Sequence, residues 1–187
     1  MTRPPAIEHD VDHTVAHQPR GADGYVSTMY DDHHAEVYAF LVRSTRDPAT
    51  AEDLLQETFL RLTTEVRAGR TPELVRAWLF RVASNLAISR ARRAVTANAW
   101  LDRHGQREEL VAESPESGVL RRERSSTIER SLGRLAPDAR VAMLLSAHGF
   151  HGEEIADAVG RSHAATRSML FRARAQLRDE LLAEDAR

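Results

Sequence analysis

The chain has 187 residues, of which 42% are hydrophobic and 29% are charged, and its formal net charge is −2. This length and apolar fraction suffice for one ordinary domain or for two small helical domains with hydrophobic cores. Cysteine is absent, which excludes disulfides, thiolate zinc sites and cysteine nucleophiles and leaves His, Asp and Glu as possible metal ligands.

Residues 1–24 are expected to form a flexible tail. They mix carboxylates and histidines where a signal peptide would need an apolar stretch. The sequence also has no apolar run of about eighteen residues, the length that suggests a membrane span. We therefore expect a cytoplasmic protein that does not insert into a membrane.

Charge is segregated along the chain, so the small net charge is a poor guide to its partners. Carboxylates gather at Asp47, Glu52, Asp53 and Glu57. A basic run follows, opposed only by Glu73, at Arg67, Arg70, Arg76, Arg81, Arg90, Arg92 and Arg93. A second basic run comprises Arg161, Arg167, Arg172, Arg174 and Arg178. Such runs are typical of phosphate contacts, although either run alone also fits a solvated helix face.

Apolar residues recur every three or four positions, and glycine and proline are sparse, so the fold is predicted to be all-α. The first helix is expected from about Tyr25 to Arg43. The second begins at Asp47, whose carboxylate suits the N-cap, and Pro48, whose missing N–H costs nothing in a first turn. Its buried stripe comprises Ala51, Leu55, Phe59, Leu62 and Val66.

The second helix is predicted to end at residues 68–70, and Thr71-Pro72 repeats the cap-and-proline signal for a third. This third helix should continue into the arginines near residue 93. Residues 97–118 are polar and punctuated by glycine and proline, as in an interdomain linker. The pattern therefore predicts two helical domains, at residues 25–96 and 119–184.

The C-terminal half begins with an expected helix ending near Leu135, a break at residues 136–138 and a helix over Val141–His148. A helix-turn-helix pattern follows, in which residues 153–160 form a short helix and residues 163–182 a long one.

The turn chemistry supports the helix-turn-helix prediction. Ala156 lets the two helices cross closely, Gly160 supplies a positive φ, and Leu170 packs the second helix onto the first. Ser162 suits the N-cap of the long helix. Apolar residues would be expected in place of Arg161 and Thr166, and an aliphatic residue in place of Met169, so any helical hairpin stays an alternative.

The N-terminal half resembles region 2 of the extracytoplasmic-function (ECF) sigma factors, a subfamily of the sigma-70 family of bacterial RNA polymerase sigma factors. The resemblance is carried by residues 51–62 (AEDLLQETFLRL), 76–87 (RAWLFRVASNLA) and 90–93 (RARR). Region 4 of the same family is similar to residues 135–140 (LAPDAR), 153–156 (EEIA) and 166–174 (TRSMLFRAR).

This resemblance implies a region 2 domain of three to four helices and a region 4 helix-turn-helix domain. Such a protein binds core RNA polymerase and directs promoter recognition and transcription initiation. It implies docking on the polymerase β′ clamp helices and β flap, with an anti-sigma factor as a further partner. The residues expected to bind polymerase are Asp53, Gln56, Glu57 and Leu60.

The resemblance also assigns DNA contacts to both halves. Region 2 would capture the melted −10 strand, with bases received by the loop of residues 68–73 and by nearby side chains, through Arg70, Trp78, Asn85, Arg92 and Arg93. Trp78 has a competing role in the hydrophobic core. Region 4 would bind the −35 duplex by placing the N-terminal part of its second helix in the major groove, through Arg167, Ser168, Phe171, Arg172 and Arg174.

Two other classes of protein stay open. One is a helix-turn-helix regulator that binds operators without stable polymerase binding. The other is a metal sensor or enzyme using His9, His13 and His17, which would share one face if the tail were helical, although a flexible tail fits this segment better. No catalytic set, metal site or cofactor motif is otherwise recognised, so no enzyme activity and no cofactor are expected.

Overall fold

The computed structural model describes the backbone of residues 21–104 and 119–185, and the side chains of residues 21–96 and 127–183. Within these ranges the chain is all-α, as predicted, and no described helix has the length and apolar character of a membrane span. The helices are α1 (Gly21–Thr45), α2 (Pro48–Arg67), α3 (Val75–His104), α4 (Val119–Arg134), α5 (Pro137–Ala147), α6 (Gly152–Val159) and α7 (His163–Asp185).

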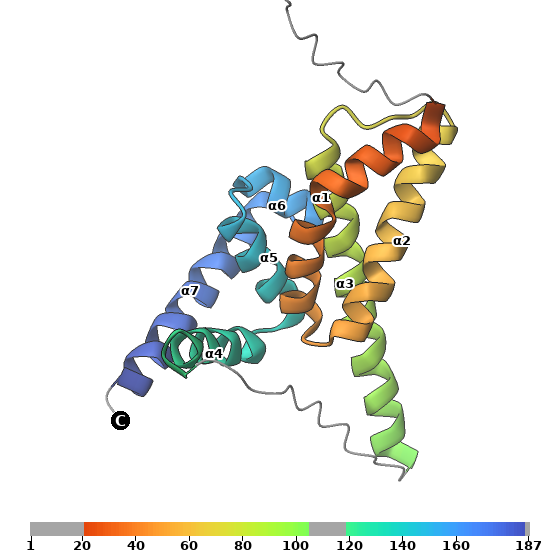
Figure 1. Cartoon of the computed structure of the whole chain (residues 1–187). Helices are drawn as coiled ribbons and strands as arrows, with labels where there is room; N and C mark the ends of the chain where they lie inside the picture. The colour runs from red at the N-terminus through yellow and green to blue at the C-terminus, as the bar shows by residue number, and fades with distance from the viewer. Residues whose placement is uncertain (1–20, 105–118, 186–187) are drawn as a thin grey trace, which may run out of the picture.

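Helices α1, α2 and α3 form the N-terminal group (Figure 1). The predicted N-cap of α2 is confirmed, because the Asp47 carboxylate accepts hydrogen bonds from the backbone N–H groups of Ala49 at 3.3 Å and Thr50 at 3.1 Å. The predicted apolar stripe of α2 is buried at all positions except the half-buried Val66. The core of this group also includes Val37, Phe40, Leu41, Leu79 and Phe80.

The ends of two helices differ from the prediction. Residues 21–24, expected in the tail, are the first residues of α1, whereas residues 1–20 lie outside the described residues. Helix α3 begins at Val75 and not at Thr71-Pro72, because the chain first crosses from α2 and Val75 is the first residue that packs on the core. Its other end runs to His104, so part of the expected linker is helical, and the rest lies outside the described residues.

Helices α4 to α7 form the C-terminal group (Figure 1). The predicted interruption is present at Leu135 and Ala136, whereas Pro137 and Asp138, also expected in it, form the first turn of α5. The predicted helix-turn-helix is present in α6 and α7. Gly160 has φ 66°, and the Ser162 hydroxyl accepts a hydrogen bond from the backbone N–H of Ala165 at 3.3 Å.

The two groups of helices pack directly against each other, with α5 and α6 against α3 and with α5 also against α1 (Figure 1). The sequence pattern indicates two domains but contains no sign of this contact. Each group has its own buried residues, including Leu41 and Leu62 in the first and Leu145 and Ile155 in the second. The contact therefore joins the two groups through a continuous hydrophobic core, in which buried residues of both groups belong to one cluster.

Two leucines of α2 differ in burial, so their substitution tests how much the hydrophobic core stabilises the fold. Leu62 is fully buried, whereas Leu60 is 62% exposed. Leu62→Ala should lower the free energy of unfolding by about 2–5 kcal/mol, because it leaves a cavity, and Leu60→Ala should change it by less than about 0.5 kcal/mol. Urea denaturation followed by circular dichroism measures both. Equal losses would contradict the burial of α2 described here.

Candidate nucleic-acid and partner interfaces

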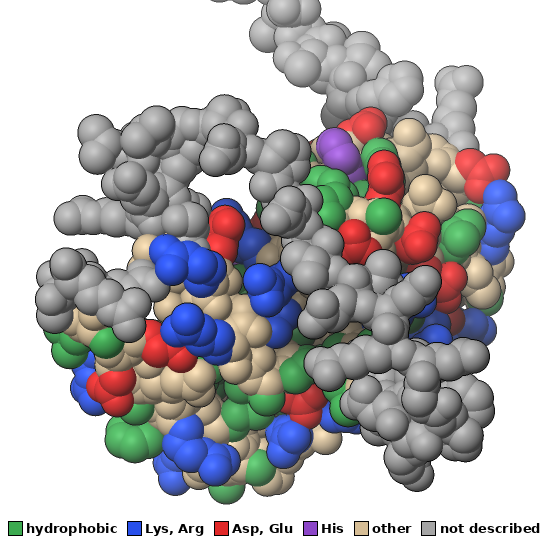
Figure 2. All heavy atoms as spheres, turned by 90° about the horizontal axis from the view of Figure 1, so that it is seen from below, with side chains coloured by type: hydrophobic (Ala, Val, Ile, Leu, Met, Phe, Trp, Pro, Cys, Tyr) green, Lys and Arg blue, Asp and Glu red, His purple; other side chains and the backbone are tan. Residues whose placement is uncertain are grey.

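The second helix of the helix-turn-helix presents a basic face to solvent. Its exposed side chains include all five residues predicted to meet duplex DNA, Arg167, Ser168, Phe171, Arg172 and Arg174. Phe171 is 73% exposed, which is unusual for a large apolar residue and suits contact with a thymine methyl group. In Figure 2, arginine side chains are prominent over the C-terminal helices, and carboxylates gather over the N-terminal ones.

Two of these arginines are held by local contacts. Arg172 Nε donates to the backbone carbonyl of Ser168 at 3.3 Å, and Arg174 Nη2 donates to the Ser146 hydroxyl at 3.1 Å. Neither guanidinium forms an ion pair among the described residues. Both therefore keep their positive charge available for a phosphate or a base edge.

The three unexpected residues of the helix-turn-helix have different environments. Met169 is buried and fills a core position, so its side chain serves in place of an aliphatic one. Thr166 is fully buried, and its hydroxyl has no hydrogen-bond partner among the described residues. Arg161 is not in the core: its guanidinium reaches Asp138 of α5, with Nη2 at 2.7 Å from Oδ2.

An exposed polar stripe runs along α3. Asn85 and Arg93, both predicted to contact DNA, lie on it, and Arg81 and Ser89 continue it at helical spacing. Arg81 is a candidate that the sequence prediction missed, although its position four residues before Asn85 would have indicated it. The stripe combines an amide with guanidinium groups, which are the groups needed to contact bases and phosphates of a single strand.

The other region 2 residues predicted to contact DNA already take part in contacts within the protein. Arg70 pairs with Glu65 through two hydrogen bonds of 2.8 and 3.0 Å, at the exposed end of α2. Arg92 donates to Asp138 Oδ2 at 3.0 Å, across the boundary between the domains. Trp78 is half-buried, packs against the core and lines a cavity. Its position is therefore compatible with a place in the hydrophobic core and with contact to the −10 strand.

The four residues predicted to bind polymerase share one face of α2. Their positions follow helical spacing, at Asp53, Gln56, Glu57 and Leu60. Three are exposed, and Glu57 is half-buried and accepts a hydrogen bond from Arg61 Nε at 2.8 Å. The face therefore combines carboxylates with the exposed apolar side chain of Leu60.

A carboxylate of α5 joins the two domains. Oδ2 of Asp138 accepts hydrogen bonds from Arg92 of α3 and from Arg161, which precedes α7. Only 12% of the Asp138 side chain is exposed. Burial raises the pKa of this carboxyl, but the hydrogen bonds from Arg161 and Arg92 outweigh burial and bring the pKa below its ordinary value.

A second polar cluster crosses the same boundary. The Glu36 carboxylate of α1 forms an ion pair with Arg76 of α3. Its Oε1 atom lies 3.2 Å from Nδ1 of His148, at the end of α5. Arg76 also donates to the His148 carbonyl at 3.3 Å. The hydrogen bonds from Arg76 hold the pKa of the Glu36 carboxyl below its ordinary value, against the effect of burial.

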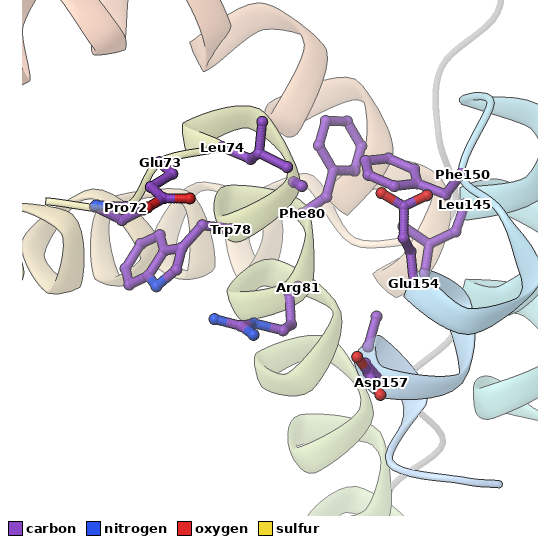
Figure 3. Close-up of a pocket in the computed structure, with 12 residues that line it drawn as sticks. Pro72, Glu73, Leu74, Trp78, Phe80, Arg81, Leu145, Phe150, Glu154 and Asp157 are labelled. Atoms are coloured by element: carbon purple, nitrogen blue, oxygen red, sulfur yellow. The ribbon is translucent and has the colours of Figure 1, made fainter. Parts of the chain in front are cut away.

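A cavity of about 420 Å³ lies between α3 and the C-terminal helices (Figure 3). Its apolar lining includes Trp78 and Phe80 from α3 and Leu145 and Phe150 from the other domain. Leu74, at the mouth of this lining, is 73% exposed. Glu73, Arg81, Glu154 and Asp157 add charge to it, so the cavity is an apolar gap with polar edges.

Two family models match the sequence: sigma-70 region 2 at residues 29–96 and sigma-70 region 4 at residues 125–177. The chain belongs to the sigma-70 family of RNA polymerase sigma factors. One relative is the ECF RNA polymerase sigma factor SigL of Mycobacterium tuberculosis, 30% identical over 161 residues, which cover 80% of this chain and 85% of SigL. Another is the RNA polymerase sigma-H factor of Pseudomonas aeruginosa, 30% identical over 148 residues, covering 74% and 77% of the two chains.

A similar solved structure is that of the sigma factor RpoE in complex with the anti-sigma factor NepR from Bartonella quintana. It has a TM-score of 0.63 and 26% sequence identity, and the match covers 83% of this chain and 95% of RpoE. These likenesses confirm the predicted family and its ECF subfamily. The protein is a sigma factor, which acts in transcription initiation with core RNA polymerase and promoter DNA.

The histidine alternative has no support in the described part of this sigma factor, where no group of three His, Asp or Glu side chains could hold a metal ion. His9, His13 and His17 themselves lie outside the described residues.

Two buried threonines of this sigma factor test the cost of the unpaired hydroxyl. Thr166→Val should raise the free energy of unfolding by about 1 kcal/mol, because it removes a buried polar group without a partner. The matched control is Thr58→Val. Thr58 is equally buried, but its hydroxyl donates to the Leu54 carbonyl at 2.7 Å, so this change should be destabilising or neutral. Thermal unfolding of both variants measures these changes. A lower stability of the Thr166 variant would contradict the conclusion that its hydroxyl is buried without a hydrogen-bond partner.

Proposed function

We propose that three helices divide the work of this sigma factor. Helix α2 docks on the β′ clamp helices of core polymerase, α3 captures the melted −10 strand, and α7 binds the −35 duplex. The observation that carries this proposal is that each helix exposes a distinct chemical face while its opposite face is buried in a domain core.

The α2 face suits a protein partner that is basic and partly apolar. The carboxylates of Asp53 and Glu57 would steer such a partner, while Leu60 would be buried by it. Burial of the exposed Leu60 side chain by a partner would favour binding by about 25 cal/mol for each Å² of apolar surface removed from water. The face is therefore proposed to bind polymerase and not DNA.

The α3 stripe suits single-stranded DNA. Arginines at positions 81, 92 and 93 would follow the phosphates, and Asn85 would hydrogen-bond a base edge. The loop of residues 68–73, with Arg70 and neighbouring Trp78, would receive an unstacked base. This assignment places the −10 contacts on α3 and on the loop that precedes it.

The face of α7 suits duplex DNA. Its positive charges and exposed Phe171 follow directly on the turn at Gly160, which is where a recognition helix enters the major groove. Arg167 and Arg172 would contact phosphates or guanine, and Phe171 would contact a thymine methyl group. Region 4 would also bind the β flap of polymerase.

We further propose that this sigma factor catalyses no reaction, needs no cofactor and acts in the cytoplasm, where RNA polymerase is found. An anti-sigma factor is proposed as a regulatory partner. This proposal is supported by the similar sigma factor RpoE, whose structure was solved with the anti-sigma factor NepR.

Reconstituted transcription tests the function as a whole. Core polymerase with this protein should start transcription at discrete sites in a genomic promoter library, and start-site mapping should recover shared −10 and −35 elements. Leu60→Ala, which should keep the fold intact, should weaken binding to core polymerase. Operator binding without any polymerase complex would contradict the proposal and favour a helix-turn-helix regulator.

Substitution of Arg172 tests whether α7 binds DNA independently of polymerase binding by α2. Arg172→Ala should weaken binding to the −35 duplex about tenfold or more, because it removes a cation from the major-groove face. The variant should bind core polymerase as the wild type does. The control is Arg178→Ala, an exposed arginine further along the same helix, which should have a smaller effect. Fluorescence anisotropy gives the DNA affinities, and equal loss of DNA and polymerase binding would contradict the assignment.

A further inference from the structure

The turn that leads into α7 is tied to two other helices through Arg161. Its guanidinium donates from Nε and Nη2 to a single atom, Oδ2 of Asp138, at 3.2 and 2.7 Å. The Asp138 side chain is only 12% exposed and lies in the first turn of α5. The backbone N–H of Arg161 donates to the Ala156 carbonyl of α6 at 3.0 Å. Arg161 therefore connects α5 and α6 at the point where α7 is about to begin.

The beginning of α7 has little apolar packing of its own. Residues 161–165 are exposed, and the buried Thr166 carries an unpaired hydroxyl. The first buried apolar side chain of the helix is Met169, in its second turn. Arg167 and Ser168, which are proposed to contact the −35 duplex, lie in this part of the helix. The ion pair thus holds a stretch that apolar residues at positions 161 and 166 would otherwise hold.

A second contact holds α7 further along its length. Arg174 Nη2 donates to the Ser146 hydroxyl near the end of α5 at 3.1 Å, whereas Asp138 lies at the start of α5. Two contacts near opposite ends of one helix define the direction of the other. Contact with base edges depends on such a fixed direction, because hydrogen bonds in the major groove tolerate little displacement.

We propose that Asp138 is a positioning residue for −35 recognition: through Arg161, it holds the start of α7 in the orientation that presents Arg167 and Ser168 to the major groove. This inference rests on the proposed −35 contacts of α7. Asp138 touches no DNA in this scheme. Arg161, although it belongs to a basic run, acts through the carboxylate and not through a phosphate.

The rival role of Arg161 is a direct phosphate contact, and the two roles predict opposite effects of neutralising Asp138. If Arg161 contacted a phosphate, Asp138→Asn would free a cation and remove a negative charge near the DNA. Both changes would strengthen binding to the −35 element. If Asp138 positions α7, the same substitution weakens recognition of that element, although the protein becomes less negative.

The test uses holoenzyme reconstituted from core polymerase and the full-length chain. Initiation is measured at a promoter recovered by start-site mapping and at the same promoter with its −35 element scrambled, and the ratio of the two rates gives the −35 discrimination. Asp138→Asn should lower this ratio about tenfold, because it breaks a charge-assisted pair, and should leave affinity for core polymerase unchanged. An unchanged or higher ratio overturns the proposal.

Two control variants separate positioning from other effects of charge. Glu153→Gln neutralises an exposed carboxylate of α6 that forms no ion pair among the described residues, and it should leave the ratio unchanged. Arg92→Gln removes the other partner of Asp138, which donates to Oδ2 at 3.0 Å from α3. It should lower initiation at both promoters alike and keep their ratio. A tenfold fall in the ratio with either control contradicts the proposal.

Substitutions of the exposed Arg161 keep the test valid even if Asp138→Asn lowers the Tm. Arg161→Gln should reduce the ratio by about the same factor as Asp138→Asn, and the double variant should reduce it no further, because either change breaks the same pair. Arg161→Lys should retain most of the discrimination, since both hydrogen bonds end on one oxygen and do not need the fork of a guanidinium.

Losses that add in the double variant, or equal losses with Arg161→Lys and Arg161→Gln, overturn the pairing as the cause. If the wild-type holoenzyme itself shows no preference for the −35 element, the proposed role of α7 fails, and the positioning role of Asp138 fails with it.

Discussion

Phe80 contacts aromatic rings of both domains, and the contact between the domains is organised around this side chain. Its ring centroid lies 5.1 Å from that of Phe40 in the N-terminal domain, and 4.9 and 5.0 Å from those of His148 and Phe150 in the C-terminal domain. The Arg76 guanidinium stacks over Phe80 at 5.0 Å while it pairs with Glu36. A fully buried side chain of α3 thus depends on both domains for its burial.

The boundary between the domains contains ion pairs in addition to the apolar contacts of the hydrophobic core. The cores are apolar and close-packed, so their loss costs several kcal/mol for each large side chain. At the boundary, paired charges offset the cost of removing them from water, and such pairs contribute little net stability. The contact between the domains therefore combines an apolar part around Phe80 with a polar part at the ion pairs of Arg76 and Arg92.

Local signals in the sequence predicted the helices well, but their ends less well. The cap at Asp47 and the turn at Gly160 were predicted because each depends on neighbouring residues. The sequence predicts the break before α5, but Pro137 lies inside that helix and Thr71-Pro72 lies before α3, since proline marks a boundary without showing on which side the helix lies. The pairing of Arg92 with Asp138, 46 positions later, has no periodic signal, so the contact between domains could not be predicted.

Arg140 of α5 lies at the corner between α4 and α5 and contacts both domains. Its guanidinium donates to the carbonyls of Leu132, Gly133 and Leu135 within its own domain and, through Nη1 at 3.0 Å, to the Ser44 carbonyl at the end of α1. The Arg140 guanidinium thus fixes the corner between α4 and α5 and joins that corner to the end of α1.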